Sequence, residues 1–177
     1  MFTQRLSLIP FFMIGGWMAV SVANAQDPAC PYTLASLQGP YSVVLTYGAN
    51  AALGLQTETL DGKGNLTRVG VINQPTAGST TGARTVVTVS SAGTYKVNCD
   101  GTGTFIRVIT LPDGSKASAS DDFIITSAIK QEGRLIATTM SDAQRDPSVV
   151  IPGGIFVTRV HTRLPEVLVC ASCTRTF

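Results

Sequence analysis

Residues 93–105 read GTYKVNCDGTGTF, and this stretch shows how the chain is built. Two alternating runs, about 84–98 and 103–111, are rich in β-branched and aromatic residues, and they flank the turn sequence Asp100-Gly101-Thr102-Gly103. Alternation with a period of two is typical of a strand with one buried face, and glycine accepts the positive φ that tight hairpin turns need. The stretch therefore predicts a β-hairpin.

The same pattern recurs along the chain, whereas helical periodicity is nearly absent after residue 25. The fourth run contains Ala92-Gly93, where a glycine predicts a kink or a split. The turns between runs are mostly short, which favours an all-β fold, an eight-stranded antiparallel up-and-down barrel. A two-sheet β-sandwich of the same strands is the alternative. The eight predicted strands are 41–47, 52–60, 66–74, 84–98, 103–111, 121–128, 134–142 and 154–163.

The N-terminal 25 residues have the three parts of a secretory signal. A short basic segment ending at Arg5 precedes an apolar run, and Ala23-Asn24-Ala25 provides small side chains for cleavage. We predict cleavage after Ala25, a single β-barrel domain over 26–177, and a secreted or periplasmic protein with no membrane span. The 13 basic and 11 acidic residues of the full chain nearly balance, so the charge gives no indication of a nucleic-acid partner.

Four cysteines, Cys30, Cys99, Cys170 and Cys173, follow the predicted cleavage site. An even number in an oxidising compartment predicts two disulfides, with three possible pairings, of which we prefer Cys30–Cys99 with Cys170–Cys173. The C-x-x-C at 170–173 has only four residues after it, too few for the helix that activates a redox thiol. With one histidine in the chain, zinc lacks a second ligand pair. We predict no metal and no cofactor.

Three motifs carry a family resemblance: Leu37-Gln38-Gly39-Pro40-Tyr41, Leu60-Asp61-Gly62-Lys63-Gly64-Asn65, and residues 93–104. On these the chain resembles small secreted bacterial β-barrel proteins of the calycin or allene-oxide-cyclase-like type. Gly39-Pro40-Tyr41 is similar to the lipocalin G-x-W with tyrosine in place of tryptophan. The resemblance implies a barrel that encloses a pocket for a small apolar molecule. An allene-oxide-cyclase-like enzyme would in addition need an ionisable group inside the barrel.

The alternating strand positions supply residues for such a pocket. Four small residues would leave room in the interior if they point inward: Ala52, Gly54, Gly70 and Ala137. Phe105 and Phe123 would fill that room if they point inward. The candidate ligand-binding residues are Tyr41, Val43, Leu45, Phe105, Phe123 and Ile125.

Two features among the charged residues of the predicted strands could carry chemistry. Arg159, His161 and Arg163 alternate and so share one face, which we interpret as a solvated outer face or as a site for a carboxylate or phosphate. Glu58 is the acid well inside a strand; we expect it on the surface, and it is the one catalytic candidate if it is buried.

Three functions from different classes follow. The first is a non-catalytic barrel that binds a small hydrophobic molecule, and the second is an isomerase or cyclase acting on such a molecule. The third is a structural or interaction module with a filled interior, for which the loops 74–83 and 143–153 are the next places to look. An outer-membrane barrel is a weaker option, because the 7% aromatic content is low for the aromatic girdles of that class. The oligomeric state cannot be read from the sequence.

Overall fold

The computed structural model describes residues 30–48, 51–151 and 153–165. A short 3-10 helix, η1, precedes the strands and spans Leu34–Ser36. The described residues form eight strands: β1 (Gln38–Tyr47), β2 (Ala52–Asp61), β3 (Asn65–Pro75), β4 (Arg84–Val97), β5 (Thr102–Thr110), β6 (Lys116–Gln131), β7 (Arg134–Gln144) and β8 (Val157–Arg163).

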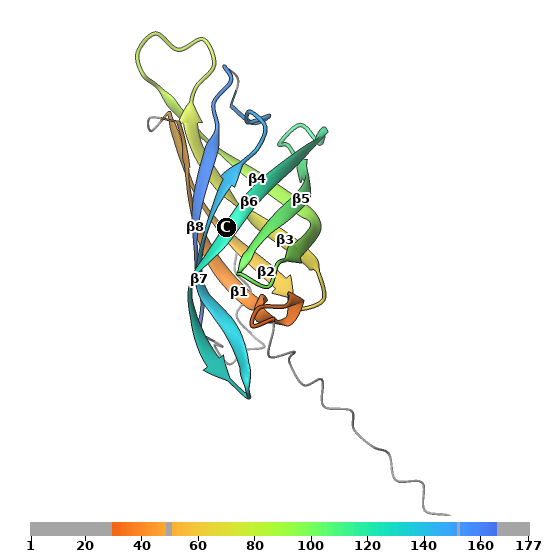
Figure 1. The fold of residues 1–177 in the computed structure, drawn as a ribbon. Helices are drawn as coiled ribbons and strands as arrows, with labels where there is room; N and C mark the ends of the chain where they lie inside the picture. Colours follow the sequence, from red (N-terminus) through yellow and green to blue (C-terminus); the bar gives the residue numbers. More distant parts are fainter. Residues whose placement is uncertain (1–29, 49–50, 152, 166–177) are drawn as a thin grey trace, which may run out of the picture.

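The strands close into an antiparallel barrel in sequence order, β1 to β8, with β8 paired to β1 (Figure 1). The predicted barrel is confirmed over the sandwich, and every predicted strand is present, although β6 runs over Lys116–Gln131 where 121–128 was predicted. Residue 93 does not split the fourth strand, because β4 runs through it and pairs with both β3 and β5 around that point. The longer loops, β3–β4 and β7–β8, lie at the upper end in Figure 1, and η1 lies at the lower end.

The turn at the end of β2 shows why the short turns form where the sequence places them. Asp61 Oδ1 accepts the backbone N–H groups of Lys63 at 2.7 Å and Asn65 at 2.9 Å, while Gly62 and Gly64 both have positive φ. Asp100 and Asp113 accept a backbone N–H two residues further on in the same way. These aspartates fix their own turns, as short polar side chains do.

A disulfide closes the lower end of the barrel. Cys30 and Cys99 are bonded with Cα atoms 4.5 Å apart, which confirms the preferred first pairing. The second proposed pair, Cys170–Cys173, and the predicted signal segment lie outside the described residues. A disulfide is typical of proteins from oxidising compartments. Among the described residues, no helix has the length and apolar character needed to cross a membrane.

The interior is filled in three layers. The lower layer is apolar and holds most of the buried aromatic residues, with the ring centroids of Phe105 and Phe123 4.5 Å apart. The upper layer is also apolar, and the β7–β8 loop contributes Ile151 to it, with Val150 and Ile155 packed against it. Between them lies a layer of charged side chains. The lower apolar layer comprises Leu37, Tyr41, Leu60, Leu66, Tyr95, Phe105, Phe123, Ile125, Ala137 and Met140, and the upper one Leu45, Tyr47, Ala52, Ile72, Val89, Ile151 and Val157.

The small residues do not leave room in the interior. A Cβ added at Gly54 would meet Leu45 Cδ1 at 2.8 Å, and one added at Gly70 would collide with the backbone oxygen of Leu55. These glycines allow neighbouring strands and side chains to approach closely, as glycine in a strand often does. Their smallness therefore serves the tight closure of the barrel.

The outer face carries many exposed apolar residues among threonines and serines. Four of them lie side by side on four neighbouring strands, because Val160 pairs with Val44, Val44 with Leu55 and Leu55 with Val71. Each is more than a third exposed. We call these four residues the outer apolar row.

Candidate functional site

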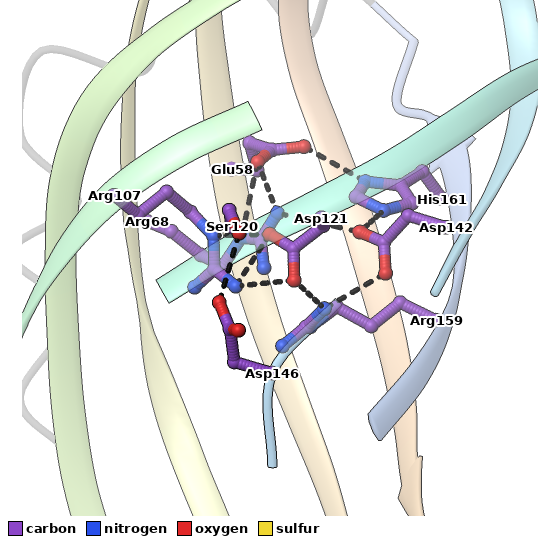
Figure 2. A network of polar contacts seen from close by, with 9 residues as sticks. All are labelled: Glu58, Arg68, Arg107, Ser120, Asp121, Asp142, Asp146, Arg159 and His161. Carbon is purple, nitrogen blue, oxygen red and sulfur yellow. Dashed lines mark hydrogen bonds and ion pairs between the residues drawn. The ribbon is translucent and has the colours of Figure 1, made fainter. Parts of the chain in front are cut away.

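Seven charged or titratable side chains from six strands meet in the middle of the barrel, and we call them the ionic layer (Figure 2). Each is at most 5% exposed, although residues of these types are rarely buried unless paired. The ionic layer consists of Glu58 (β2), Arg68 (β3), Arg107 (β5), Asp121 (β6), Asp142 (β7), and Arg159 and His161 (both β8).

Glu58 is completely buried, so its expected surface position is wrong. Its Oε1 accepts hydrogen bonds from Arg68 Nε at 3.0 Å and Arg68 Nη2 at 2.5 Å, and its Oε2 lies 2.8 Å from His161 Nδ1. Burial alone would raise the pKa of this carboxyl, but the charge of Arg68 and the hydrogen bond from His161 outweigh burial and lower the pKa to about 2. Glu58 is therefore a fixed anion at neutral pH, whereas a general base needs a pKa near the working pH.

His161 lies between two carboxylates. Its Nδ1 is 2.8 Å from Glu58 Oε2, and its Nε2 is 2.8 Å from Asp142 Oδ2. An ionised carboxylate only accepts hydrogen bonds, so both ring nitrogens must donate, and a ring that donates twice is the imidazolium. Burial lowers the pKa of His161, but the hydrogen bonds to Asp142 and Glu58 prevail and raise it. The imidazole ring also stacks on Phe105, with ring centroids 5.9 Å apart.

Asp142 and Asp121 are bridged by one arginine. Arg159 Nη1 donates to Asp142 Oδ1 at 2.7 Å and to Asp121 Oδ1 at 2.9 Å. Arg107 donates from Nε and Nη2 to the two carboxylate oxygens of Asp121, at 2.7 and 2.8 Å. Burial raises the pKa of Asp142, but Arg159 and His161 reverse this and hold it below its ordinary value. Every carboxylate of the layer is thus committed to cations of the same chain.

Arg159, His161 and Arg163 lie on the same face of β8, as predicted. This face points into the barrel, and Arg159 and His161 are buried there. The expected solvated outer face is therefore wrong for Arg159 and His161, because the barrel closes over them. Arg163 is half-buried at the lower end of the barrel, away from the ionic layer, with Nη1 3.4 Å from Gln131 Oε1. The structure therefore does not bring all three together as one site.

The predicted ligand-binding residues all point into the barrel and are buried. Tyr41, Phe105, Phe123 and Ile125 belong to the lower apolar layer, where they pack against one another. The Tyr41 hydroxyl donates to the backbone oxygen of Ala137 at 2.9 Å, so its polar end is also satisfied. Val43 is completely buried, and its register partner on β8 is His161.

A cavity of about 20 Å³ lies above the ionic layer, near the upper end of the barrel. That volume holds one particle the size of a water molecule, which needs roughly 10–15 Å³. Its polar lining includes Arg107 and Arg159, and Leu45 is the one predicted ligand-binding residue that reaches it. The lining residues are Leu45, Tyr47, Gln56, Ile72, Val89, Ser90, Ser91, Arg107, Ile109, Val150 and Arg159. None of these is a carboxylate or a histidine.

Two larger hollows lie on the outside of the barrel. One, of about 450 Å³, crosses β2 to β5 and is lined mainly by outward residues such as Thr59, Thr67 and Val108. The other, of about 510 Å³, lies beside the β6–β7 hairpin, next to Leu164 and Pro165. Both are open; the first has Arg68 and Lys116 in its lining and the second Arg163, so neither contains the pair Arg107 and Arg159 of the inner cavity.

Four members of the ionic layer were not among the predicted site residues: Arg68, Arg107, Asp121 and Asp142. The signal that could have found them is their position, because each has an apolar residue two positions away on the inner face of its strand. Arg107 lies between Phe105 and Ile109, for example, and Asp121 between Ala119 and Phe123. Charges of both signs at such positions on several strands indicate a paired buried layer.

Comparison of the chain with protein-family models, with curated proteins and with solved structures found no match. The likeness to calycin or allene-oxide-cyclase-like barrels therefore stays a prediction. The geometry of the ionic layer and of the cavity has to carry the functional argument.

Proposed function

We propose that this chain is a secreted or periplasmic, non-catalytic barrel that binds a small amphipathic anion, such as a medium-chain carboxylate, at its upper end. The observation that carries the proposal is the lining of the inner cavity, where two buried guanidinium groups lie beneath an apolar wall. Guanidinium matches the geometry of a carboxylate, and an apolar wall suits the hydrocarbon part of such a molecule.

We favour binding over an isomerase or cyclase activity because no group suited to proton transfer lines the cavity among the described residues. Glu58 and His161, the groups that could transfer a proton, are hydrogen-bonded within the ionic layer and do not line the cavity. The lining residues among the described part of the chain can donate hydrogen bonds and pack against a hydrocarbon, but none has a pKa suited to proton abstraction. Such a set binds and orients an anion without transforming it.

A bound molecule needs more space than the cavity offers, because ligand pockets are usually about 300 Å³ or larger. The upper apolar layer can supply this space without disturbing the strands, since part of it comes from the β7–β8 loop. Val150 lines the cavity and Ile151 is buried in the same layer. Displacement of these two side chains would open the upper end above Arg107 and Arg159.

Isothermal titration of the purified protein with octanoate and with 1-octanol tests the proposal, because the two differ in the charged head group. We expect one octanoate per chain and binding of octanol that is weaker by about tenfold or more, the factor that a lost charge-assisted hydrogen bond of about 1.5–3 kcal/mol gives. Arg107→Gln should weaken octanoate to a similar extent, and the exposed Arg84→Gln is the matched control. Equal affinity for octanoate and octanol would overturn the proposal. So would the absence of binding of either compound by both the wild type and the Ile151→Ser variant.

A second candidate function, an interaction module, is favoured by the outer apolar row. Val160, Val44, Leu55 and Val71 are neighbours across four strands and are 37–57% exposed. Contiguous exposed apolar surface of this kind often marks a protein contact, and a second copy of the chain is the simplest partner. Light scattering over a concentration series should detect a dimer that Leu55→Asp disrupts, with Thr57→Asp as a control; a monomer at all concentrations would exclude self-association.

A further inference from the structure

The ionic layer has one positive charge more than it has negative charges. It contains three arginines and an imidazolium that donates from both nitrogens, against three carboxylates. A guanidinium stays protonated in proteins, so the excess cannot be removed by deprotonating an arginine at neutral pH. An uncompensated charge in a buried layer is costly unless a counter-ion accompanies it.

Arg107 pairs with a single carboxylate of the layer, Asp121, and shares it with Arg159. Burial, together with the like charges of Arg68 and Arg159, lowers the pKa of the Arg107 guanidinium to about 10, in spite of its ion pair with Asp121. Arg159, by contrast, is shared by two carboxylates, and its pKa is raised. Of the two arginines that line the cavity, Arg107 is therefore the less well compensated.

Hydrogen-bond donors are also in excess. Arg107 uses Nε and Nη2, and Arg159 uses only Nη1, for the hydrogen bonds they make to described residues, which leaves N–H groups of both side chains for the cavity they line. Arg68 Nη1, in the same layer, is also buried without an acceptor. Buried polar atoms are nearly always paired, so several surplus donors indicate that the layer lacks an acceptor.

The cavity fits such an acceptor in size and chemistry. Its volume of about 20 Å³ has room for one small particle but not for a sulfate or phosphate. Besides the two guanidinium groups, Gln56 and Ser91 contribute side chains that can donate hydrogen bonds, while no carboxylate among the described residues lines the cavity to repel an anion.

We propose that this cavity is a binding site for a single monovalent inorganic anion of the size of chloride, held between Arg107 and Arg159, that neutralises the ionic layer. The site does not rest on the proposed function, because it needs no movement of the β7–β8 loop and no organic ligand. An organic carboxylate and the inorganic anion would compete for the same guanidinium groups.

Bromide scatters anomalously and replaces chloride, so crystals grown in sodium bromide locate the anion directly. We expect one anomalous peak inside the barrel within hydrogen-bond reach of both Arg107 and Arg159. Ser91→Val keeps every charge but fills the cavity, and should abolish this peak; Thr88→Val, on the outer face of the same strand, should keep it. No interior peak in the wild type, or a peak that persists in Ser91→Val, would overturn the proposal.

Thermal unfolding in solution provides the second readout. In sodium chloride the midpoint should be higher than in sodium gluconate at equal concentration, by roughly 3 °C or more, since gluconate is too large for the cavity and an ion that binds only the folded state raises stability. Ser91→Val and Arg107→Gln should remove the difference between the two salts, and Thr88→Val should retain it. An equal midpoint in both salts for the wild type would show that water, not an anion, occupies the cavity.

Discussion

Replacing Glu58 by glutamine removes one charge from the centre of the ionic layer and keeps the shape of the side chain. Arg68 then loses the carboxylate that accepts from its Nε and Nη2, and His161 loses one of its two anionic partners. Arg68 is 3% exposed, so water cannot replace the lost partner. The variant therefore leaves a buried cation whose remaining carboxylate partner is more distant, with Asp142 Oδ2 3.9 Å from Arg68 Nη2.

Two routes give the size of the effect. The fall of the Glu58 pKa from 4.5 to about 2, at about 1.4 kcal/mol for each pKa unit, corresponds to about 3 kcal/mol of stability. Removal of one partner from a buried ion pair usually costs about 3–5 kcal/mol. We therefore expect Glu58→Gln to lower the free energy of unfolding by about 3 kcal/mol at pH 7.

The pH dependence distinguishes lost charge from lost packing. Because the folded-state pKa of Glu58 is depressed, its contribution is fully present above about pH 4.5 and is lost as the pH falls through about 2. The difference in stability between wild type and Glu58→Gln should accordingly be largest above pH 5 and shrink as the pH approaches 2. Urea unfolding at a series of pH values, with the exposed Glu132→Gln as control, measures this difference. A loss below 1 kcal/mol at pH 7, or a loss that does not change with pH, would refute the reasoning.

Three further predictions concern other parts of the barrel. The pKa of His161 is raised in the folded state, so its stabilising charge is fully present below the unfolded value of 6.5 and is lost as the pH rises through the folded value; urea unfolding from pH 6 to 9 should show a decline that His161→Gln lacks. The Cys30–Cys99 bond closes a separation of 69 residues, so Cys30→Ser with Cys99→Ser should cost about 4 kcal/mol by chain entropy, and an unchanged urea midpoint would contradict this. A Cβ at Gly93 would collide with the backbone oxygen of Ile106, so Gly93→Ala should cost about 2–3 kcal/mol, seen as a lower thermal midpoint, whereas a neutral effect would mean that the strands can separate there.

The strands and their order could be predicted from the sequence because both depend on local chemistry. Alternation of side chains marks each strand, and aspartate–glycine sequences such as Asp61-Gly62 build their turn from atoms a few residues apart. Short turns join consecutive strands as antiparallel neighbours, so eight of them in series lead to an up-and-down barrel. The disulfide between Cys30 and Cys99 was a preferred choice among three pairings, and only the fold decided it.

Most of the ionic layer was not predicted, because alternation gives a strand two faces, and around Glu58, Arg159 and His161 it does not tell which of them is inside. Arg159 and His161 alternate with apolar Val160, and Glu58 alternates with Thr57 and Thr59. The expectation that charged residues are exposed therefore assigns the wrong face of these two strands to the solvent. Burial of charge becomes favourable only when partners meet, and the partners of His161 lie 103 and 19 residues away along the chain.

The sequence by itself determined the strands, the turns and the order of the hairpins, since each depends on neighbours along the chain. The tertiary structure alone decided that the interior of the barrel is charged at its middle. It also decided that apolar residues, including the outer apolar row, lie on the outer face. The physical reason is closure: when β8 pairs with β1, the inner faces of distant strands meet, and Glu58, Asp142 and His161 can satisfy one another there. That long-range pairing compensates the cost of burying each charge, and no local pattern contains it.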